Sequence, residues 1–302
     1  MSSLSPTEYG FYEFVMEKVD YFSNTHFWPT HRQLDPRTWL SNFSSEEKHY
    51  ALHLLNFFCF FSADLTNTLF KHALSNVSNY YRKFFGDNKQ WQKICNNTYI
   101  TYVSGENPNP ADSGYLFTRK ARDYCGIAES NIIDHNTIFR EPERLRGTNL
   151  IFVDDFIGSG SQIITCLKKQ IKSDGNTFIG LCKEYNITIL YCPLVSTKLG
   201  LERIHNFSKN LIILPVHVLG SSYNVFAENS LCWKGELREN GIKVIEVTSR
   251  RAGIPMIDSQ DVNYWQGFCK LGLALGFDHC TPDATIPIFT WNQNGWKPLI
   301  RK

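Results

Sequence analysis

The stretch Asn149–Ile163, NLIFVDDFIGSGSQI, joins an apolar run to two adjacent aspartates and then to a loop of glycine and serine. A continuous apolar run bounded by turn residues is typical of a fully buried strand. In open α/β sheets, ligands bind at the carboxyl ends of such strands. We therefore expect Asp154 and Asp155 to emerge at a ligand site, directly before a tight turn into a helix that begins near Gln162.

The loop that follows the aspartates has the composition of an anion site. Glycines let backbone N–H groups converge on an anion, and the start of a helix adds positive partial charge. Serine hydroxyls supply further donors, and the carboxylates suit sugar hydroxyls or a Mg²⁺ ion near the phosphate. The motif predicts a pocket for a phosphorylated ribose; the alternative is that the aspartates only cap the next helix or lie in solvent. The loop residues are Gly158, Ser159, Gly160, Ser161 and Gln162.

Strand and helix patterns alternate on both sides of this motif, which predicts an α/β fold with a mostly parallel sheet. Helices are expected in YLFTRKARDYCG and SQIITCLKKQI, and REPERLRG is expected to be a polar connection. The expected strands, besides NLIFVDD, are TYITYVS (98–104), NIIDHNTIF (131–139), NITILYCPLV (186–195), NLIILPVHVL (210–219) and IKVIEVT (242–248).

The flanking regions give a three-part organisation. Residues 1–95 have helical spacing of apolar residues, and Ser44 with Glu47 three positions later matches a capping box at one helix start. Residues 96–250 form the expected α/β core. Residues 251–302 are expected to contain a helix near Tyr264–Leu275 and then a proline-rich cap.

Composition gives no indication of a nucleic-acid-binding, disulfide-rich or membrane-spanning protein. The net charge of +2 is too close to neutral to indicate nucleic-acid or membrane binding from bulk electrostatics. The 9 cysteines include no CxxC pair, which favours free thiols in a reducing cytoplasm. The start of the chain lacks an export signal, and no apolar run reaches the ~20 residues that span a bilayer. We expect a cytoplasmic protein without a membrane segment.

The segment Val153–Ser161 resembles the loop of the type I phosphoribosyltransferases that binds the 5-phosphate of phosphoribosyl pyrophosphate (PRPP). The resemblance implies a phosphoribosyltransferase-like, Rossmann-like core, compatible with the organisation from Tyr99 to about Val247. It also implies that Asp154 and Asp155 contact the ribose 2- and 3-hydroxyls, directly or through Mg²⁺, and that residues 158–162 hold the phosphate.

The same resemblance places a second, pyrophosphate-binding loop after the first strand of the core. Its counterpart runs from Ser104, Gly105 and Glu106 to Ser113 and Gly114, and it is longer and more acidic than the family's pattern. The family's mobile loop is reduced here to REPERLRG.

Two residues of the phosphate loop also depart from the pattern. Gly158 stands where purine-salvage members have an aspartate, and Gln162 replaces a small or hydroxyl residue. The departures do not favour ordinary purine salvage, and those of the two other loops weaken the case for transfer with pyrophosphate release.

Further segments resemble a narrower group, the bacterial phosphoribosyltransferase-like proteins of anti-phage defence neighbourhoods, some of which lie beside retron reverse transcriptases. These segments are TWLSNFSSEEKHYALHLLNFF, SGYLFTRKAR, TPDATIPIFTW and WKPLIRK.

Three functions remain open from the sequence. The first is an enzyme acting at C1 of a phosphorylated ribose by glycosyl transfer or N-glycosidic cleavage. The second is a non-catalytic sensor of a nucleotide or PRPP that assembles with a partner such as a reverse transcriptase–DNA complex. The third is a nucleic-acid-binding subunit that uses Arg140, Arg144 and Arg146. The apolar first third also leaves room for an interface between copies of the chain.

Overall fold

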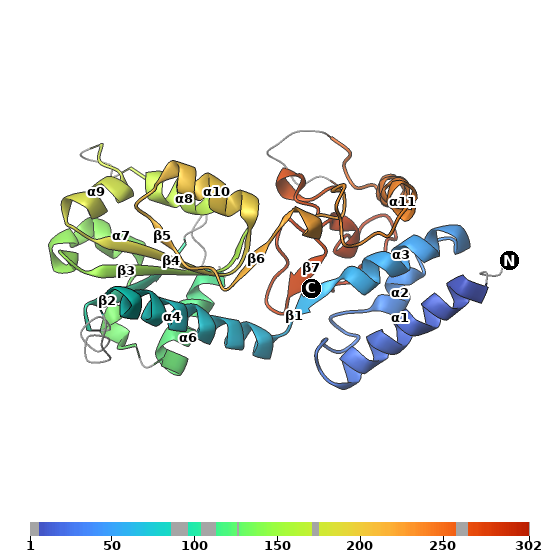
Figure 1. The fold of residues 1–302 in the computed structure, drawn as a ribbon, viewed down its shortest axis with the longest axis horizontal. Helices are drawn as coiled ribbons and strands as arrows, with labels where there is room; N and C mark the ends of the chain where they lie inside the picture. The colour runs from blue at the N-terminus through green and yellow to red at the C-terminus, as the bar shows by residue number, and fades with distance from the viewer. Residues whose placement is uncertain are drawn as a thin grey trace. The chain divides into compact units, whose positions relative to one another are not determined.

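The computed structural model describes residues 6–85, 96–103, 113–125, 127–170, 175–257 and 265–301. The chain divides into two compact units (Figure 1). The terminal unit combines Met1–Ala63 with Gly220–Lys302, and the sheet unit is Asp64–Leu219. This division differs from the sequential one expected from the sequence, since the two ends of the chain share one unit and the long helix after residue 63 belongs to the other.

The sheet unit is built on a parallel sheet, as the alternating pattern predicts. Its strands are β2 (Thr98–Tyr102), β3 (Asn149–Ile157), β4 (Thr188–Thr197), β5 (Ile212–Ile213) and β6 (His217–Leu219). The order is β2-β3-β4-β5, and β6 also pairs with β4. All of these pairings are parallel, so the carboxyl ends of the strands lie at one edge.

Helices cover both faces of this sheet (Figure 1). One face carries α4 (Ala63–Phe85) and α6 (Ser113–Cys125), and the other carries α8 (Ser161–Lys168), α9 (Phe178–Glu184) and α10 (Lys198–Phe207). Between the second face and its helices lies a buried apolar core drawn from β3, β4, α8, α9 and α10. This core includes Leu150, Phe152, Ile163, Tyr191 and Ile204.

The terminal unit is mainly helical, with an aromatic core. It contains α1 (Pro6–Asn24), α2 (Pro36–Leu40), α3 (Ser45–Phe57), α11 (Leu237–Ala252) and a parallel pair of short strands, β1 (Cys59–Phe61) and β7 (Leu275–Phe277). The indole N–H groups of Trp39 and Trp296 both donate to the carbonyl of Ile288, at 2.9 and 3.0 Å. Trp296 therefore packs in the core, since both its ring and its N–H are used there.

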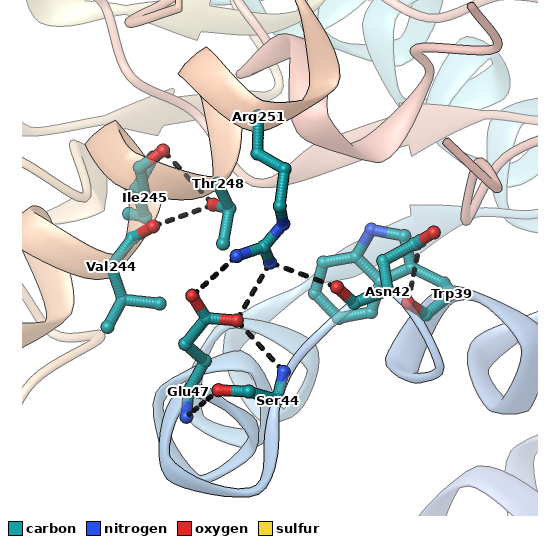
Figure 2. Close-up of polar contacts among 8 residues, drawn as sticks. All are labelled: Trp39, Asn42, Ser44, Glu47, Val244, Ile245, Thr248 and Arg251. Carbon is teal, nitrogen blue, oxygen red and sulfur yellow. Dashed lines mark hydrogen bonds and ion pairs between the residues drawn. The ribbon is translucent and has the colours of Figure 1, made fainter. Parts of the chain in front are cut away.

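The predicted capping box is present at the start of α3 and is extended by a contact from α11 (Figure 2). The Ser44 hydroxyl accepts from the Glu47 N–H at 3.3 Å, and the Glu47 carboxylate accepts from the Ser44 N–H at 2.9 Å. Arg251 then donates to both oxygens of Glu47, at 2.8 and 2.7 Å, and to the carbonyl of Asn42 at 3.0 Å. One carboxylate thus caps a helix and ties two distant segments together.

The prediction of a strand at residues 242–248 is wrong, because this segment lies within helix α11. Gly241, Ile245, Thr248 and Ala252 are buried at helical spacing, whereas Val247 is exposed. A short alternation of apolar and polar residues fits a strand or a helix equally, and only the buried face distinguishes them. The helix ends at Gly253, whose left-handed conformation is usual for that position.

The prediction of a helix near Tyr264–Leu275 is also wrong for the described residues 265–275. They form a short 3-10 turn, η4 (Phe268–Lys270), and the start of β7. Gly267, Cys269, Lys270 and Gly272 all have positive φ, which a right-handed helix does not accommodate.

The prediction of a strand at residues 131–139 is wrong for most of the segment. A single parallel bridge between Ile132 and Ile100 extends the sheet, and helix α7 (His135–Arg140) follows. Asp134 caps this helix by accepting from the Asn136 N–H at 2.6 Å. The polar connection REPERLRG that comes next contains a 3-10 helix, η2 (Pro142–Leu145).

The described cysteines agree with the expectation of free thiols. The seven cysteines whose side chains are described are free thiols, and burial raises the pKa of Cys182 to about 12. Among the described helices, none combines the length and the apolar character needed to cross a bilayer.

Candidate functional site

The loop between β3 and α8 has the backbone geometry of an anion site. It consists of Gly158, Ser159 and Gly160, and Gly160 is the N-cap of α8 with φ 76° and ψ 1°. A left-handed residue followed by helical ones turns successive N–H groups toward one concave side. Gly160 offers no side-chain cap to the N–H groups of Gln162 and Ile163, whereas the N–H of Ser161 donates to the Ser159 hydroxyl. The loop therefore suits a phosphate.

The two serines of the loop interact with each other. The Ser159 hydroxyl donates to the Ser161 hydroxyl at 2.9 Å and accepts from the Ser161 N–H at 3.3 Å. Ser159 is buried, whereas Gln162 is exposed. These bonds hold the turn in one shape, which is the requirement for a preorganised anion site.

The start of α10 supports the loop from the side. Thr197 donates from its hydroxyl to the carbonyl of Gly158 at 2.5 Å and accepts from the Gly200 N–H at 3.0 Å. A Cβ at Gly200 would lie 2.4 Å from the Gly158 carbonyl oxygen, and one at Gly160 would lie 2.9 Å from the Gly200 carbonyl oxygen. Glycines at these positions therefore permit the loop to rest directly on the first turn of α10.

Asp154 is part of the protein interior. It lies within β3, is 6% exposed, and accepts from the Tyr191 hydroxyl at 2.6 Å through one oxygen. Its other oxygen accepts from the Asp155 N–H at 3.0 Å. Burial raises the pKa of the Asp154 carboxyl well above its usual value, and the nearby Asp155 adds to the shift. Burial and Asp154 also raise the pKa of the Tyr191 phenol.

Asp155 follows on the opposite face of the strand, because successive side chains of a strand alternate in direction. It is 5% exposed, close to the value for Asp154. Both aspartates lie two or three residues before the end of β3 rather than beyond it. Carboxylate oxygens are the ligands that Mg²⁺ prefers. Asp154, with both oxygens engaged by protein donors, fits a metal poorly.

The second predicted loop is described only in part. Ser104, Gly105 and Glu106 lie outside the described residues, and Ser113 and Gly114 are the first two residues of α6. Strand β2, which precedes this loop, is parallel to and paired with β3. The carboxyl ends of β2 and β3 therefore lie at the same edge of the sheet.

The arginines that precede β3 make contacts within the protein. Arg144 lies over the ring of Tyr99 and donates to the carbonyl of Ser130 at 3.1 Å. Arg146 lies over the ring of Tyr185 and pairs with Glu143 at 2.9 Å. These contacts engage two of the three arginines considered for nucleic-acid binding, and all three arginines, Arg140 included, are exposed.

Helix α6 borders a separate hollow of about 610 Å³ in the sheet unit. Its described lining residues are Thr118, Arg119, Arg122, Glu129 and Ile132. Arg122 pairs with Asp123 at 2.9 Å and approaches Glu129 at 3.8 Å. Arg119 also approaches Asp123, at 3.7 Å, so acidic neighbours offset the positive charge of the described lining residues.

Tyr191, Thr197 and Gly200 were not identified from the sequence. The sequence does contain one signal for this helix start. Thr197 comes at the end of an apolar run, three positions before Gly200, and threonine is a common N-cap residue. The bonds from Tyr191 to Asp154 and from Thr197 to Gly158 join residues 37 and 39 apart, and no local pattern reports such contacts.

Comparison with known proteins identifies the family of this chain. No curated protein matches the chain. A crystal structure of a hypothetical protein from Neisseria gonorrhoeae with bound ppGpp is similar, with 14% identity and a TM-score of 0.33, over 62% of this chain and 94% of that one. The PRTase-CE family matches residues 36–302, which include all of the sheet and the loop described above. The chain thus belongs to the phosphoribosyltransferase-like PRTase-CE family.

Proposed function

We propose that the protein binds a phosphorylated ribose, as PRPP or as a nucleotide, with its phosphate on residues 158–162. The observation that carries the proposal is the left-handed Gly160, which has no capping side chain, at the start of α8 and at the ligand-binding edge of a parallel sheet. A helix start of this kind binds anions because its N–H groups and its partial positive charge act together.

The ribose would lie beside the end of β3. Asp155 would accept hydrogen bonds from its hydroxyls, or would hold a Mg²⁺ ion that the hydroxyls also bind, while Asp154 would hold the strand in shape through its bonds to Tyr191 and to the Asp155 N–H. When bound, Mg²⁺ would supply positive charge that offsets the phosphates.

In this proposal the protein acts at C1 of the ribose, by glycosyl transfer or N-glycosidic cleavage, as an effector of anti-phage defence in the bacterial cytoplasm. Positive charge develops on the ribose ring as the bond at C1 breaks, and a fixed carboxylate such as Asp155 would stabilise it. Glu106 of the second loop is a further candidate for this role. The free thiols of the described cysteines support the compartment.

A second candidate is a non-catalytic sensor, favoured by a specific observation. Where the family has a mobile loop, the segment REPERLRG (140–147) contains η2, and its Arg144 contacts Tyr99 and Ser130. A pocket that lacks a closing loop would bind a nucleotide without excluding water. Occupancy would then bias assembly with a reverse transcriptase, a nucleic acid or a second copy of the chain.

The test is calorimetric titration of PRPP, AMP and NAD with Mg²⁺ into the wild type and into a Ser161→Asp variant. Ser161 is the first residue of α8, so a carboxylate there repels a phosphate but interacts favourably with the helix dipole. Ser45→Asp adds the same charge at the first residue of α3 and serves as the matched control.

We expect micromolar binding of at least one ligand, about −8 kcal/mol. Ser161→Asp should weaken this binding roughly tenfold or more, equivalent to about 1.4 kcal/mol, without lowering the melting temperature, and Ser45→Asp should leave it unchanged. Chromatography of the titrated samples separates the two candidates, because an enzyme releases pyrophosphate or a free base. A folded wild type that binds none of the three ligands would refute the proposal.

A further inference from the structure

The hydroxyl of Thr197 makes two bonds that serve two different structures. It donates to the carbonyl of Gly158 at 2.5 Å, and it accepts from the Gly200 N–H at 3.0 Å as the N-cap of α10. Thr197 is the last residue of β4 and is buried. Its single proton and its lone pair thus join the β3–α8 loop to the neighbouring strand and helix.

The first of these bonds determines how one peptide unit of the loop is turned. In a trans peptide the C=O and the following N–H point in opposite directions. Because Thr197 holds the Gly158 carbonyl, the Ser159 N–H is directed away from Thr197. If that carbonyl turned outward instead, it would present negative partial charge on the side where a phosphate would bind.

We propose that Thr197 is a positioning residue, which sets the orientation of the Gly158–Ser159 peptide and thereby the shape of the anion-binding loop. Its effect on ligand binding rests on the proposed function, whereas its effect on the loop does not. The close approach of Gly200 to Gly158 supports the inference, since a Cβ at Gly200 would meet both the Gly158 carbonyl oxygen at 2.4 Å and the Ile157 side chain at 2.6 Å.

The chain contains a matched control for the second bond. Thr177 caps α9 in the same way, accepting from the Gly180 N–H at 3.2 Å, with φ −93° and ψ 162° against −85° and 148° for Thr197. Both residues are followed by glycine three positions later. Replacing Thr177 by valine removes a helix cap alone, whereas replacing Thr197 by valine removes a cap and the bond to the loop.

The experiment measures backbone hydrogen exchange of the segment 156–164 by mass spectrometry in the wild type, Thr197→Val, Thr197→Ser and Thr177→Val. The same proteins are titrated with inorganic phosphate and with PRPP. We expect Thr197→Val to speed exchange of this segment roughly fivefold to tenfold, as loss of one buried bond implies. Phosphate or PRPP affinity should fall by a similar factor. Serine retains both bonds and should restore both properties, and Thr177→Val should change neither.

The outcomes separate this inference from the proposed function. Equal exchange of segment 156–164 in Thr197→Val and Thr177→Val would overturn the positioning role, whatever the ligands do. Faster exchange in Thr197→Val, in a protein whose wild type binds neither phosphate nor PRPP, would uphold the positioning role and refute the proposed function. Faster exchange with unchanged phosphate affinity would overturn the claim that this peptide orientation serves binding.

Discussion

The ion pair between Glu47 and Arg251 is expected to stabilise the terminal unit well beyond an ordinary surface pair. Figure 2 shows the Arg251 guanidinium meeting both oxygens of the Glu47 carboxylate, one of which also accepts from the Ser44 N–H. Glutamine at position 47 can still accept from the Ser44 N–H, as glutamine does in a capping box. The change Glu47→Gln therefore removes the charge and leaves the cap.

The magnitude follows from geometry and exposure. Side-chain exposure is 15% for Glu47 and 45% for Arg251. Exposed pairs contribute about 0.2–1 kcal/mol, and hydrogen bonds to charged groups contribute about 1.5–3 kcal/mol. For a two-bond contact with one partner mostly buried, we expect a coupling free energy of about 1–2 kcal/mol.

The assay is a double-mutant cycle of Glu47→Gln and Arg251→Met by urea unfolding. A cycle of Glu246→Gln and Arg250→Met is the control, because this pair lies on the same helix with side chains 40% and 61% exposed. We expect about 0.5 kcal/mol or less for the control. A coupling at the Glu47 pair no larger than at the control pair would refute the reasoning.

The pair also has a defined pH dependence. The hydrogen bond that the Glu47 carboxylate accepts from Arg251 lowers the pKa of Glu47 below the usual 4.5. The unfolded chain therefore binds this proton more readily, and the coupling is fully present above about pH 4.5 and is lost as pH falls through the lowered pKa. A coupling independent of pH down to the acid limit of folding would contradict this account.

Two further changes test the buried titratable groups. Asp154→Asn should gain stability relative to the wild type as pH rises above about 4, and melting temperatures measured against pH would detect the gain. The raised pKa means that the unfolded chain releases this proton first, while the folded chain still holds it on a buried carboxyl beside Tyr191, so the wild type loses stability as pH rises. Burial, His49 and Lys234 lower the pKa of His53 to about 4. The free energy of unfolding of the wild type should therefore fall by about 1–2 kcal/mol between pH 7 and 4.5, after allowance for partial exposure. Urea unfolding should show a smaller fall for His53→Gln.

Local patterns identified the elements that carry the candidate site. The apolar run before Asp154, the glycine-serine loop and the apolar spacing after Ser161 each act over a few residues, and β3, the loop and α8 lie where these patterns place them. The capping box of Ser44 and Glu47 was equally visible, because both of its bonds join residues three apart.

Patterns that fit two structures gave the errors. The alternating residues 242–248 became part of α11, because burial at Ile245 and Thr248 selects helical spacing. Residues 265–275 do not form an α-helix, because the backbone there has positive φ at Gly267 and Cys269, among others.

The sequence by itself determined the parallel sheet and the position of the glycine-serine loop after β3, because backbone propensity and apolar periodicity act locally. Only the tertiary structure decided the roles of the neighbouring side chains. Asp154 is held in the interior by Tyr191, 37 residues away, and Gly158 is oriented by Thr197, 39 residues away. Such contacts depend on the register between β3 and β4, which forms only when the two strands pair in the folded chain.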